Sequence, residues 1–218
     1  ALEWLLNDTT TLSENGVTDS VLTRYALAVF YYSTDGPNWK EDIKFLSESD
    51  VCSWNGGLIQ QDDSDESYSV GLFCQQGLAM QFFQGGLNGT IPWELSLVSD
   101  LRFLRINENS LRGTLPTELG KLSALTTFNV ANNSLTGTLP TELGALSLLE
   151  EFSIQGNNLN GTLPPEFVRW TSINRIYVND NRLTGQLPTE MGEWTSLREL
   201  VIIRNIFAGP LPTEMGQL

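Results

Sequence analysis

The stretch LSALTTFNVANNSLTGTLPTELG, residues 122–144, decides the fold, because its pattern returns along the rest of the chain. Near its end stand a glycine, any residue, an isoleucine or leucine, and a proline. This tetrapeptide occurs at intervals of 24 residues, at 89–92, 113–116, 137–140, 161–164, 185–188 and 209–212. A fixed period of this length is typical of a solenoid, in which each repeat buries its apolar residues only against its neighbours.

The remaining positions of the repeat are equally regular. An apolar triplet such as Leu125, Phe128 and Val130 precedes an asparagine, which stands at 109, 133, 157, 181 and 205. The triplet predicts one short parallel strand per repeat, and the asparagine amide can satisfy backbone groups in the following turn. The glycine and proline predict a second extended segment and a bend. A weaker first copy runs through Met80, Phe82 and Leu87, with Gly85 in place of the asparagine.

These units resemble the plant-type leucine-rich repeats of receptor-kinase ectodomains, receptor-like proteins and polygalacturonase-inhibitor proteins. The resemblance covers residues 77–218 and implies an α/β-type repeat solenoid, a superhelix with a parallel sheet on its concave face. It also implies an extracellular recognition surface. The segments ALEWLLND, residues 1–8, and RYALAVFYYSTDGPNW, residues 24–39, are similar to the N-terminal region of diatom members of this superfamily.

The pattern divides the chain into two parts. Residues 1–76 are predicted to form a lead-in and a disulfide-linked capping region, and residues 77–218 about five full repeats and a partial one, without a C-terminal cap. A helix is expected from Val21 to Ser33, with Asp19 or Ser20 as its N-cap. Such a helix would cover the open end of the solenoid core.

Cys52 and Cys74 flank a segment that departs from the family's capping motif, in which the cysteines lie closer together. The resemblance and the secreted context favour a disulfide between them. A free thiol pair or half of a metal site is the alternative, but the chain has no histidine to complete such a site.

Between Cys52 and Cys74 an acidic insert contains Asp62, Asp63, Asp65 and Glu66. We expect a solvated loop there, with calcium binding as the alternative.

The composition and the motifs disfavour several classes of function. The chain has 12 basic and 26 acidic residues, a formal charge of −14, which disfavours nucleic acid and anionic lipid as partners. No phosphate loop, nucleophile elbow or acid–base pair stands out, so we expect neither an enzyme nor a cofactor. The run from Tyr25 to Tyr32 is too short to cross a bilayer, so a membrane could be reached only through a segment absent from this chain.

The pattern for N-glycosylation points to the same extracellular location. It occurs at Asn7, Asn88, Asn132 and Asn160. Asn88 and Asn160 occupy the same repeat position, which should face solvent. Asn132 should lie at the edge of the concave face, where a glycan would narrow access.

Side chains that alternate with the inward leucines should form the concave surface. They fall into three columns: Ala79, Phe103, Thr127, Glu151, Arg175 and Glu199; Gln81, Arg105, Asn129, Ser153, Tyr177 and Val201; and Phe83, Asn107, Ala131, Gln155, Asn179 and Ile203. Aromatic residues and arginine are common interface anchors. The candidate ligand-binding residues are therefore Phe83, Phe103, Arg105, Arg175, Tyr177, Val201 and Ile203.

The function expected from these features is that of a receptor-like or adhesion ectodomain that binds a protein or peptide, or alternatively a glycan. A secreted inhibitor of an extracellular enzyme is the first alternative. Ice binding is the second, because Thr90, Thr114, Thr138 and Thr162 would stack as a ladder, which breaks at Gln186 and Pro210. Threonine also simply suits an extended segment.

Overall fold

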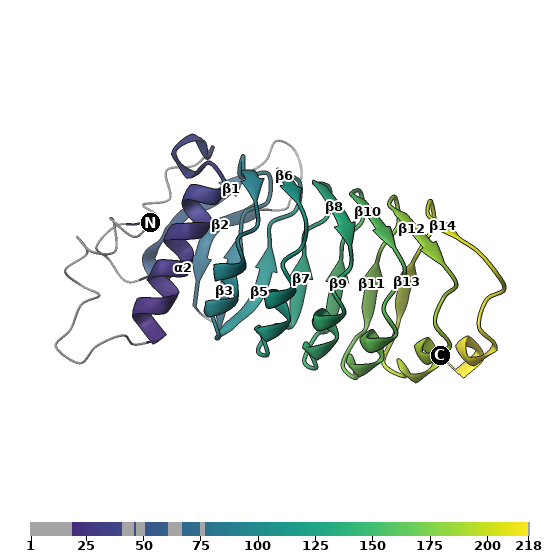
Figure 1. Ribbon diagram of the computed structural model, residues 1–218. Coiled ribbons are helices and arrows are strands. Elements are labelled where there is room, and N and C mark those ends of the chain that lie inside the picture. The colour runs from purple at the N-terminus through teal and green to yellow at the C-terminus, as the bar shows by residue number, and fades with distance from the viewer. Residues whose placement is uncertain (1–18, 41–45, 47–50, 61–66, 75–76, 218) are drawn as a thin grey trace.

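The computed structural model describes residues 19–40, 46, 51–60, 67–74 and 77–217. Its described residues form an elongated solenoid with the helix α2 (Asp19–Ser33) at its N-terminal end (Figure 1). Two sheets run along the solenoid, and a row of short 3-10 helices completes each turn.

The concave sheet has eight strands in the order β1-β2-β3-β5-β7-β9-β11-β13. From β3 onwards all pairings are parallel, as the repeat predicts. The strands are β1 (Asn55–Gln60), β2 (Ser67–Phe73), β3 (Leu78–Gln81), β5 (Leu101–Arg105), β7 (Thr127–Asn129), β9 (Glu151–Ser153), β11 (Arg175–Tyr177) and β13 (Glu199–Val201).

The second extended segment of each repeat builds a six-stranded parallel sheet, in the order β14-β12-β10-β8-β6-β4. Its strands are β4 (Asn88–Thr90), β6 (Ser110–Gly113), β8 (Ser134–Thr138), β10 (Asn158–Gly161), β12 (Arg182–Gly185) and β14 (Ile206–Phe207). Gly137 in β8 has a φ of 83°, and a Cβ atom there would lie 2.8 Å from Cγ2 of Thr114. Glycine is therefore required by both the backbone and the neighbouring threonine methyl.

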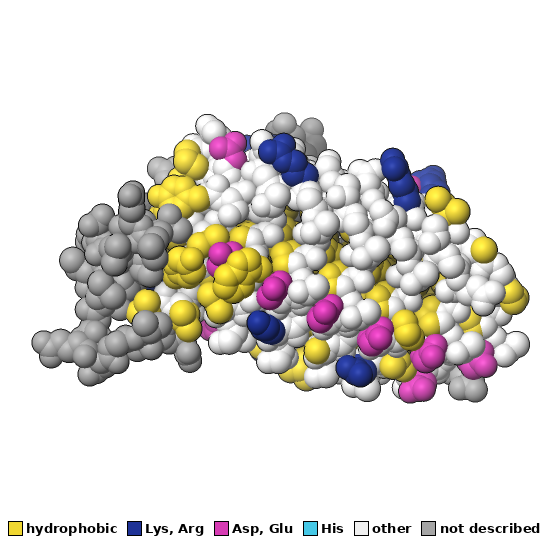
Figure 2. Space-filling model, viewed as in Figure 1, with side chains coloured by type: hydrophobic (Ala, Val, Ile, Leu, Met, Phe, Trp, Pro, Cys, Tyr) yellow, Lys and Arg dark blue, Asp and Glu magenta, His cyan; other side chains and the backbone are white. Residues whose placement is uncertain are grey.

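The proline that follows each second strand precedes a 3-10 helix, which sequence analysis did not predict. In the repeats these helices are η3 (Trp93–Leu97), η4 (Thr117–Lys121), η5 (Thr141–Ala145), η6 (Pro165–Arg169), η7 (Thr189–Glu193) and η8 (Thr213–Gln217). The recurring glutamate lies in the first turn of each, for example Glu118 in η4. Acidic side chains follow this row of helices along the face in Figure 2.

One continuous core fills the space between the sheets and the 3-10 helices. The leucines of the repeat are buried, and aromatic side chains replace some of them in the middle repeats. The rings of Phe128 and Phe152 stack with centroids 5.5 Å apart, and Trp170 packs against Phe152 at 4.8 Å. The indole of Trp170 donates a hydrogen bond to the Leu143 carbonyl, which satisfies its only polar group.

The helix α2 (Asp19–Ser33) closes the N-terminal end of this core, as predicted, but it begins two residues before the expected Val21, so Asp19 and Ser20 lie within the helix and not at an N-cap. Its side chains in the core are those of Ala26, Leu27 and Phe30. Leu27 and Phe30 are fully buried, whereas Tyr25 is half-buried. The short 3-10 helices η1 (Gly36–Asn38) and η2 (Val51–Ser53) follow α2.

The segment between the cysteines contains two strands that the sequence did not predict. Strands β1 and β2 pair antiparallel, β2 pairs antiparallel with β3, and the hairpin extends the concave sheet. The acidic positions 62, 63, 65 and 66 lie outside the described residues. Cys52 and Cys74 form a disulfide, with Cα atoms 5.5 Å apart, so the expected bridge is present.

Candidate functional site

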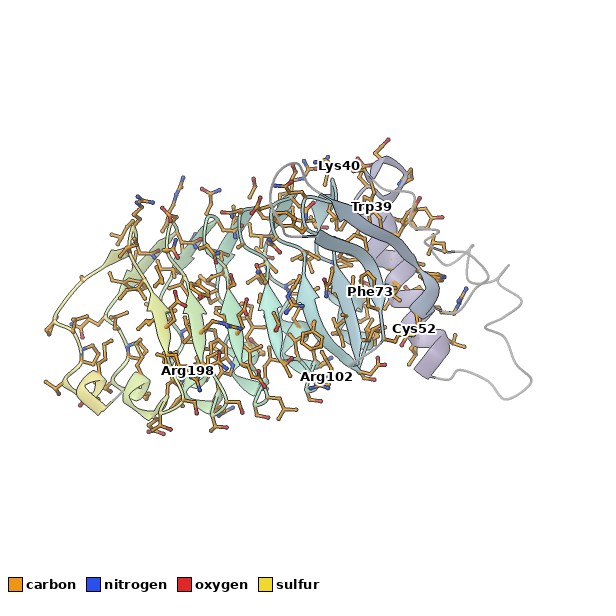
Figure 3. The ribbon with its side chains drawn as sticks, turned by 180° about the vertical axis from the view of Figure 1, so that it is seen from behind. Trp39, Lys40, Cys52, Phe73, Arg102 and Arg198 are labelled. Atoms are coloured by element: carbon orange, nitrogen blue, oxygen red, sulfur yellow. A yellow bond between two sulfur atoms is a disulfide. The ribbon has the colours of Figure 1, made fainter. Side chains whose placement is uncertain are left out.

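The concave sheet holds the candidate binding residues in fixed register. Parallel pairing places Phe103 beside Thr127, and Arg175 beside both Glu151 and Glu199. Each strand is continued by further backbone hydrogen bonds at its carboxyl end, such as Val130 N to Ser153 O. Figure 3 shows the molecule from the side opposite to that of Figure 1, with its side chains as sticks.

A cation–aromatic group lies at the N-terminal end of this surface, on β5. The guanidinium of Arg105 lies 5.1 Å from the ring centroid of Phe103, and that of Arg102 lies 5.8 Å from it. Phe103 and Arg105 are both half-buried. Desolvation lowers the pKa of Arg105, while Glu151 opposes this shift and Arg175 adds to it. Arg105 is thus a partly dehydrated cation that lies within electrostatic reach of the middle strands.

An ion pair joins the middle strands β9 and β11. Nη2 of Arg175 donates to Oε2 of Glu151 at 2.9 Å. The Arg175 side chain is half exposed, so solvent weakens the pair and its contribution to stability is small. Its main effect is to orient two opposite charges on the concave surface.

A second polar contact joins β11 to β13. The hydroxyl of Tyr177 donates to Oε2 of Glu199 at 2.6 Å. Burial, together with the hydrogen bond to Glu199 and the charge of its carboxylate, raises the pKa of Tyr177 to about 12. The phenol therefore stays protonated and acts as a hydrogen-bond donor.

The apolar candidates are placed less uniformly. Val201 is half-buried, whereas Ile203 keeps 60% of its surface exposed. Phe83 is half-buried after β3, at the other end of the solenoid. The candidates thus line the whole sheet and do not converge on one point.

Several members of the three columns are not exposed, which corrects the sequence prediction. Ala79, Thr127, Ala131 and Ser153 are buried, the last with 2% of its surface accessible. These side chains are small and lie below larger neighbours on adjacent strands. The most exposed members of the three columns are Arg175, Glu199 and Ile203.

Sequence analysis gave no prominence to the column one position earlier, at residues 102, 126, 150, 174 and 198. An open hollow of about 430 Å³ is lined by Asn174, Arg175, Arg198 and Glu199, two of which belong to this column. The 24-residue repeat could have identified this column, because it places these positions beside the predicted ones. Arg102 and Arg198 lie along the same edge of the sheet in Figure 3.

Three of the four glycosylation positions fall on described residues. Asn88 in β4 and Asn160 in β10 are exposed on the second sheet, away from the concave surface. Asn132 is exposed beyond the carboxyl end of β7, with a left-handed φ of 51°. Asn7 lies outside the described residues.

The threonine ladder is present on the second sheet. Thr90, Thr114, Thr138 and Thr162 are exposed, and each methyl group packs over the glycine of the next repeat, as between Thr138 and Gly161. Their repetition therefore has a packing cause.

The described part of the chain contains no group of three or more side chains suited to hold a metal ion. It also contains no helix long and apolar enough to span a membrane.

Comparisons with known proteins agree with this architecture. The family described as Leucine Rich Repeat matches residues 100–122, 124–146 and 148–170. Among curated protein sequences, none matches the chain.

Solved structures with the same fold include plant receptors. A crystal structure of PEPR1–AtPEP1 aligns with a TM-score of 0.72 at 24% identity, over 89% of this chain and 26% of that one. The Arabidopsis receptor kinase HAESA, in complex with the peptide hormone IDA and the co-receptor SERK1, aligns with a TM-score of 0.71 at 24% identity, over 92% and 32% of the two chains.

A third structure is closer in sequence. It is the ectodomain of the membrane receptor kinase GASSHO1/SCHENGEN3 from Arabidopsis thaliana, in complex with CASPARIAN STRIP INTEGRITY FACTOR 2. Its TM-score is 0.57 at 31% identity, over 64% of this chain and 20% of that one. The present chain spans a third or less of the length of these three structures.

The repeat, the two sheets and the disulfide-linked cap define a leucine-rich-repeat solenoid. Within that fold, the chain is similar to the plant receptor kinases HAESA and GASSHO1/SCHENGEN3.

Proposed function

We propose that this chain is the extracellular ligand-recognition part of a receptor-like or adhesion protein, and that it binds a protein or peptide through its concave sheet. The observation that carries the proposal is the contrast between rigid and variable positions. The inward positions stay apolar and the asparagine recurs from residue 109 onwards, while Phe103, Arg105, Arg175, Tyr177 and Val201 differ from strand to strand on one surface.

The chemistry of that surface suits a polypeptide. It offers exposed guanidinium groups, carboxylates, a phenol and apolar side chains, and these types are frequent at protein interfaces. The similar structures of HAESA and GASSHO1/SCHENGEN3 contain a peptide hormone and an integrity factor, respectively. The two exposed glycosylation positions on the second sheet are compatible with a concave face left clear for binding.

A selection of random peptides displayed on phage tests this proposal. Peptides retained by the chain should bind the double variant Arg105→Ala/Tyr177→Ala at least about tenfold more weakly, because both side chains belong to the concave surface. The matched control is Glu142→Ala/Arg169→Ala, which alters two exposed side chains on the 3-10 helices. Peptides that lose binding only with the control variant, or a selection that yields none, would overturn the proposal.

A further inference from the structure

One column of the concave sheet carries charges that alternate in sign. We call it the edge column, because it lies at the amino-terminal edge of the strands. It consists of Arg102, Thr126, Glu150, Asn174 and Arg198. Charged residues occupy every second repeat, as Arg102, Glu150 and Arg198, and all three are exposed. The uncharged Thr126 is buried and Asn174 is half-buried.

The backbone holds the edge column at a constant spacing. Thr126 N donates to Arg102 O at 2.8 Å, and Glu150 N donates to Thr126 O at 2.8 Å. Asn174 N donates to Glu150 O, and Arg198 N to Asn174 O, both at 2.9 Å. Because this hydrogen-bonded series is unbroken, the three charges are presented by a preorganised scaffold.

Two of the three charges are available to a ligand. Within the described residues, the side chains of Glu150 and Arg198 form neither an ion pair nor a hydrogen bond. Arg198 also lines the hollow together with Asn174 and Arg175. Arg102 shares its end of the sheet with Arg105, so positive charge is concentrated on β5.

The distance between successive charges of the edge column determines which backbone conformation of a bound peptide can match them. Adjacent strands lie about 4.8 Å apart, so successive charges of the edge column are about 9.6 Å apart. A polyproline II segment rises about 3.1 Å per residue with three residues per turn, which returns every third side chain to the same side after about 9.3 Å. A flat β-strand does not fit, because its side chains at this interval point to opposite faces.

We propose that the edge column binds a peptide segment in the polyproline II conformation that carries an acidic, a basic and a second acidic residue at three-residue intervals. The acidic residues contact Arg102 and Arg198, and the basic residue contacts Glu150. This inference rests on the proposed function and adds the sequence and conformation of the ligand. Asn132 lies at the opposite edge of the strands, so a glycan there leaves the edge column accessible.

A synthetic peptide of about twelve residues tests the proposal, with Asp, Lys and Asp three residues apart and proline and alanine elsewhere. Fluorescence anisotropy at low salt should give an affinity about tenfold higher than for the charge-reversed peptide with Lys, Asp and Lys, since three exposed ion pairs change sign. Raising the salt concentration should reduce this preference, because the charges are solvent-exposed.

Charge exchange in the protein provides the decisive comparison. The double variant Glu150→Lys/Arg198→Glu should reverse the preference between the two peptides, whereas Glu142→Lys/Arg169→Glu, which makes the same exchange on the 3-10 helices, should preserve it. No preference for either peptide, or an equal preference for a peptide whose charges are four residues apart, would overturn the edge-column proposal. Phage-selected peptides that depend on Arg105 and Tyr177 but lack the charge pattern would leave the proposed function standing.

Discussion

The asparagine that follows each strand of the concave sheet from β5 onwards bonds to three segments of backbone at once. Nδ2 of Asn157 donates to Val130 O at 3.1 Å and to Ile154 O at 3.0 Å, and its Oδ1 accepts from Leu135 N at 2.9 Å. The same contacts recur at Asn133 and Asn181. Each asparagine therefore links its own turn to the repeat before it.

Replacing Asn157 with alanine should cost about 3 kcal/mol, since several buried backbone groups would lose their partner. The neighbouring Asn158→Ala is the matched control, because Asn158 is exposed and should change stability by less than about 0.5 kcal/mol. Urea unfolding followed by circular dichroism measures both. Equal midpoints for the two variants would contradict the assigned role.

Tyr177 leads to a prediction about pH. Burial, followed by the hydrogen bond to Glu199, raises its pKa to about 12, above the value of about 10 in an unfolded chain. The folded state therefore holds this proton more tightly, and the resulting stabilisation is complete below about pH 10 and is lost as the pH rises towards 12. Ultraviolet titration of phenolate should show a component near pH 12 that disappears in Tyr177→Phe. The variant Glu199→Gln should move it to lower pH, and an unchanged titration would contradict the contact.

At the scale of elements, the 3-10 helices η5 and η6 pack so closely that glycine is needed between them. A Cβ atom on Gly144 in η5 would lie 2.5 Å from the Glu166 carbonyl oxygen in η6. Gly144→Ala should therefore destabilise the fold by about 1–3 kcal/mol through overpacking. The control is Gly216→Ala, because Gly216 has the same repeat position in η8 and no atom lies within 4 Å of the added group. Thermal unfolding should separate the two variants.

The same elements show where prediction from the sequence succeeded. The strand register, the asparagine contacts and the second extended segment follow from a period of 24 residues, because each repeat must bury its leucines against the next. The 3-10 helices were missed because a five-residue turn leaves no apolar periodicity. The hairpin of β1 and β2 was missed because it occurs once, outside the repeat, and the insert was interpreted as a loop.

The sequence predicted which residues form the columns of the candidate site, but not which of their side chains are buried. The register alone places Arg175 between Glu151 and Glu199, and both acidic residues contribute to the site. Burial of Thr127 and Ser153 could not be read from alternation, since it depends on the size of neighbouring side chains across the strands. Likewise, the hollow beside Arg198 could not be predicted from the sequence, because it depends on how neighbouring side chains pack.

At the scale of the whole molecule, each repeat is stabilised by the repeats on either side of it, because each contacts mainly its neighbours. The N-terminal end is closed by α2 and by the disulfide between Cys52 and Cys74, whose sequence separation is 22. A bridge across a loop of this size stabilises a protein by about 3 kcal/mol in the chain-entropy treatment. That stabilisation should act first on the strands beside the bridge.

Replacing both cysteines with serine should therefore lower stability unevenly along the solenoid. Hydrogen exchange followed by mass spectrometry should show faster exchange in β2 and β3, with a smaller change in β9 and β11, because the loss begins at the N-terminal end. Reduction of the unaltered chain with a thiol should produce the same gradient, which separates loss of the bridge from an effect of serine. Uniformly faster exchange in all strands would instead mean that the repeats unfold as a single cooperative unit and that the cap stabilises them together.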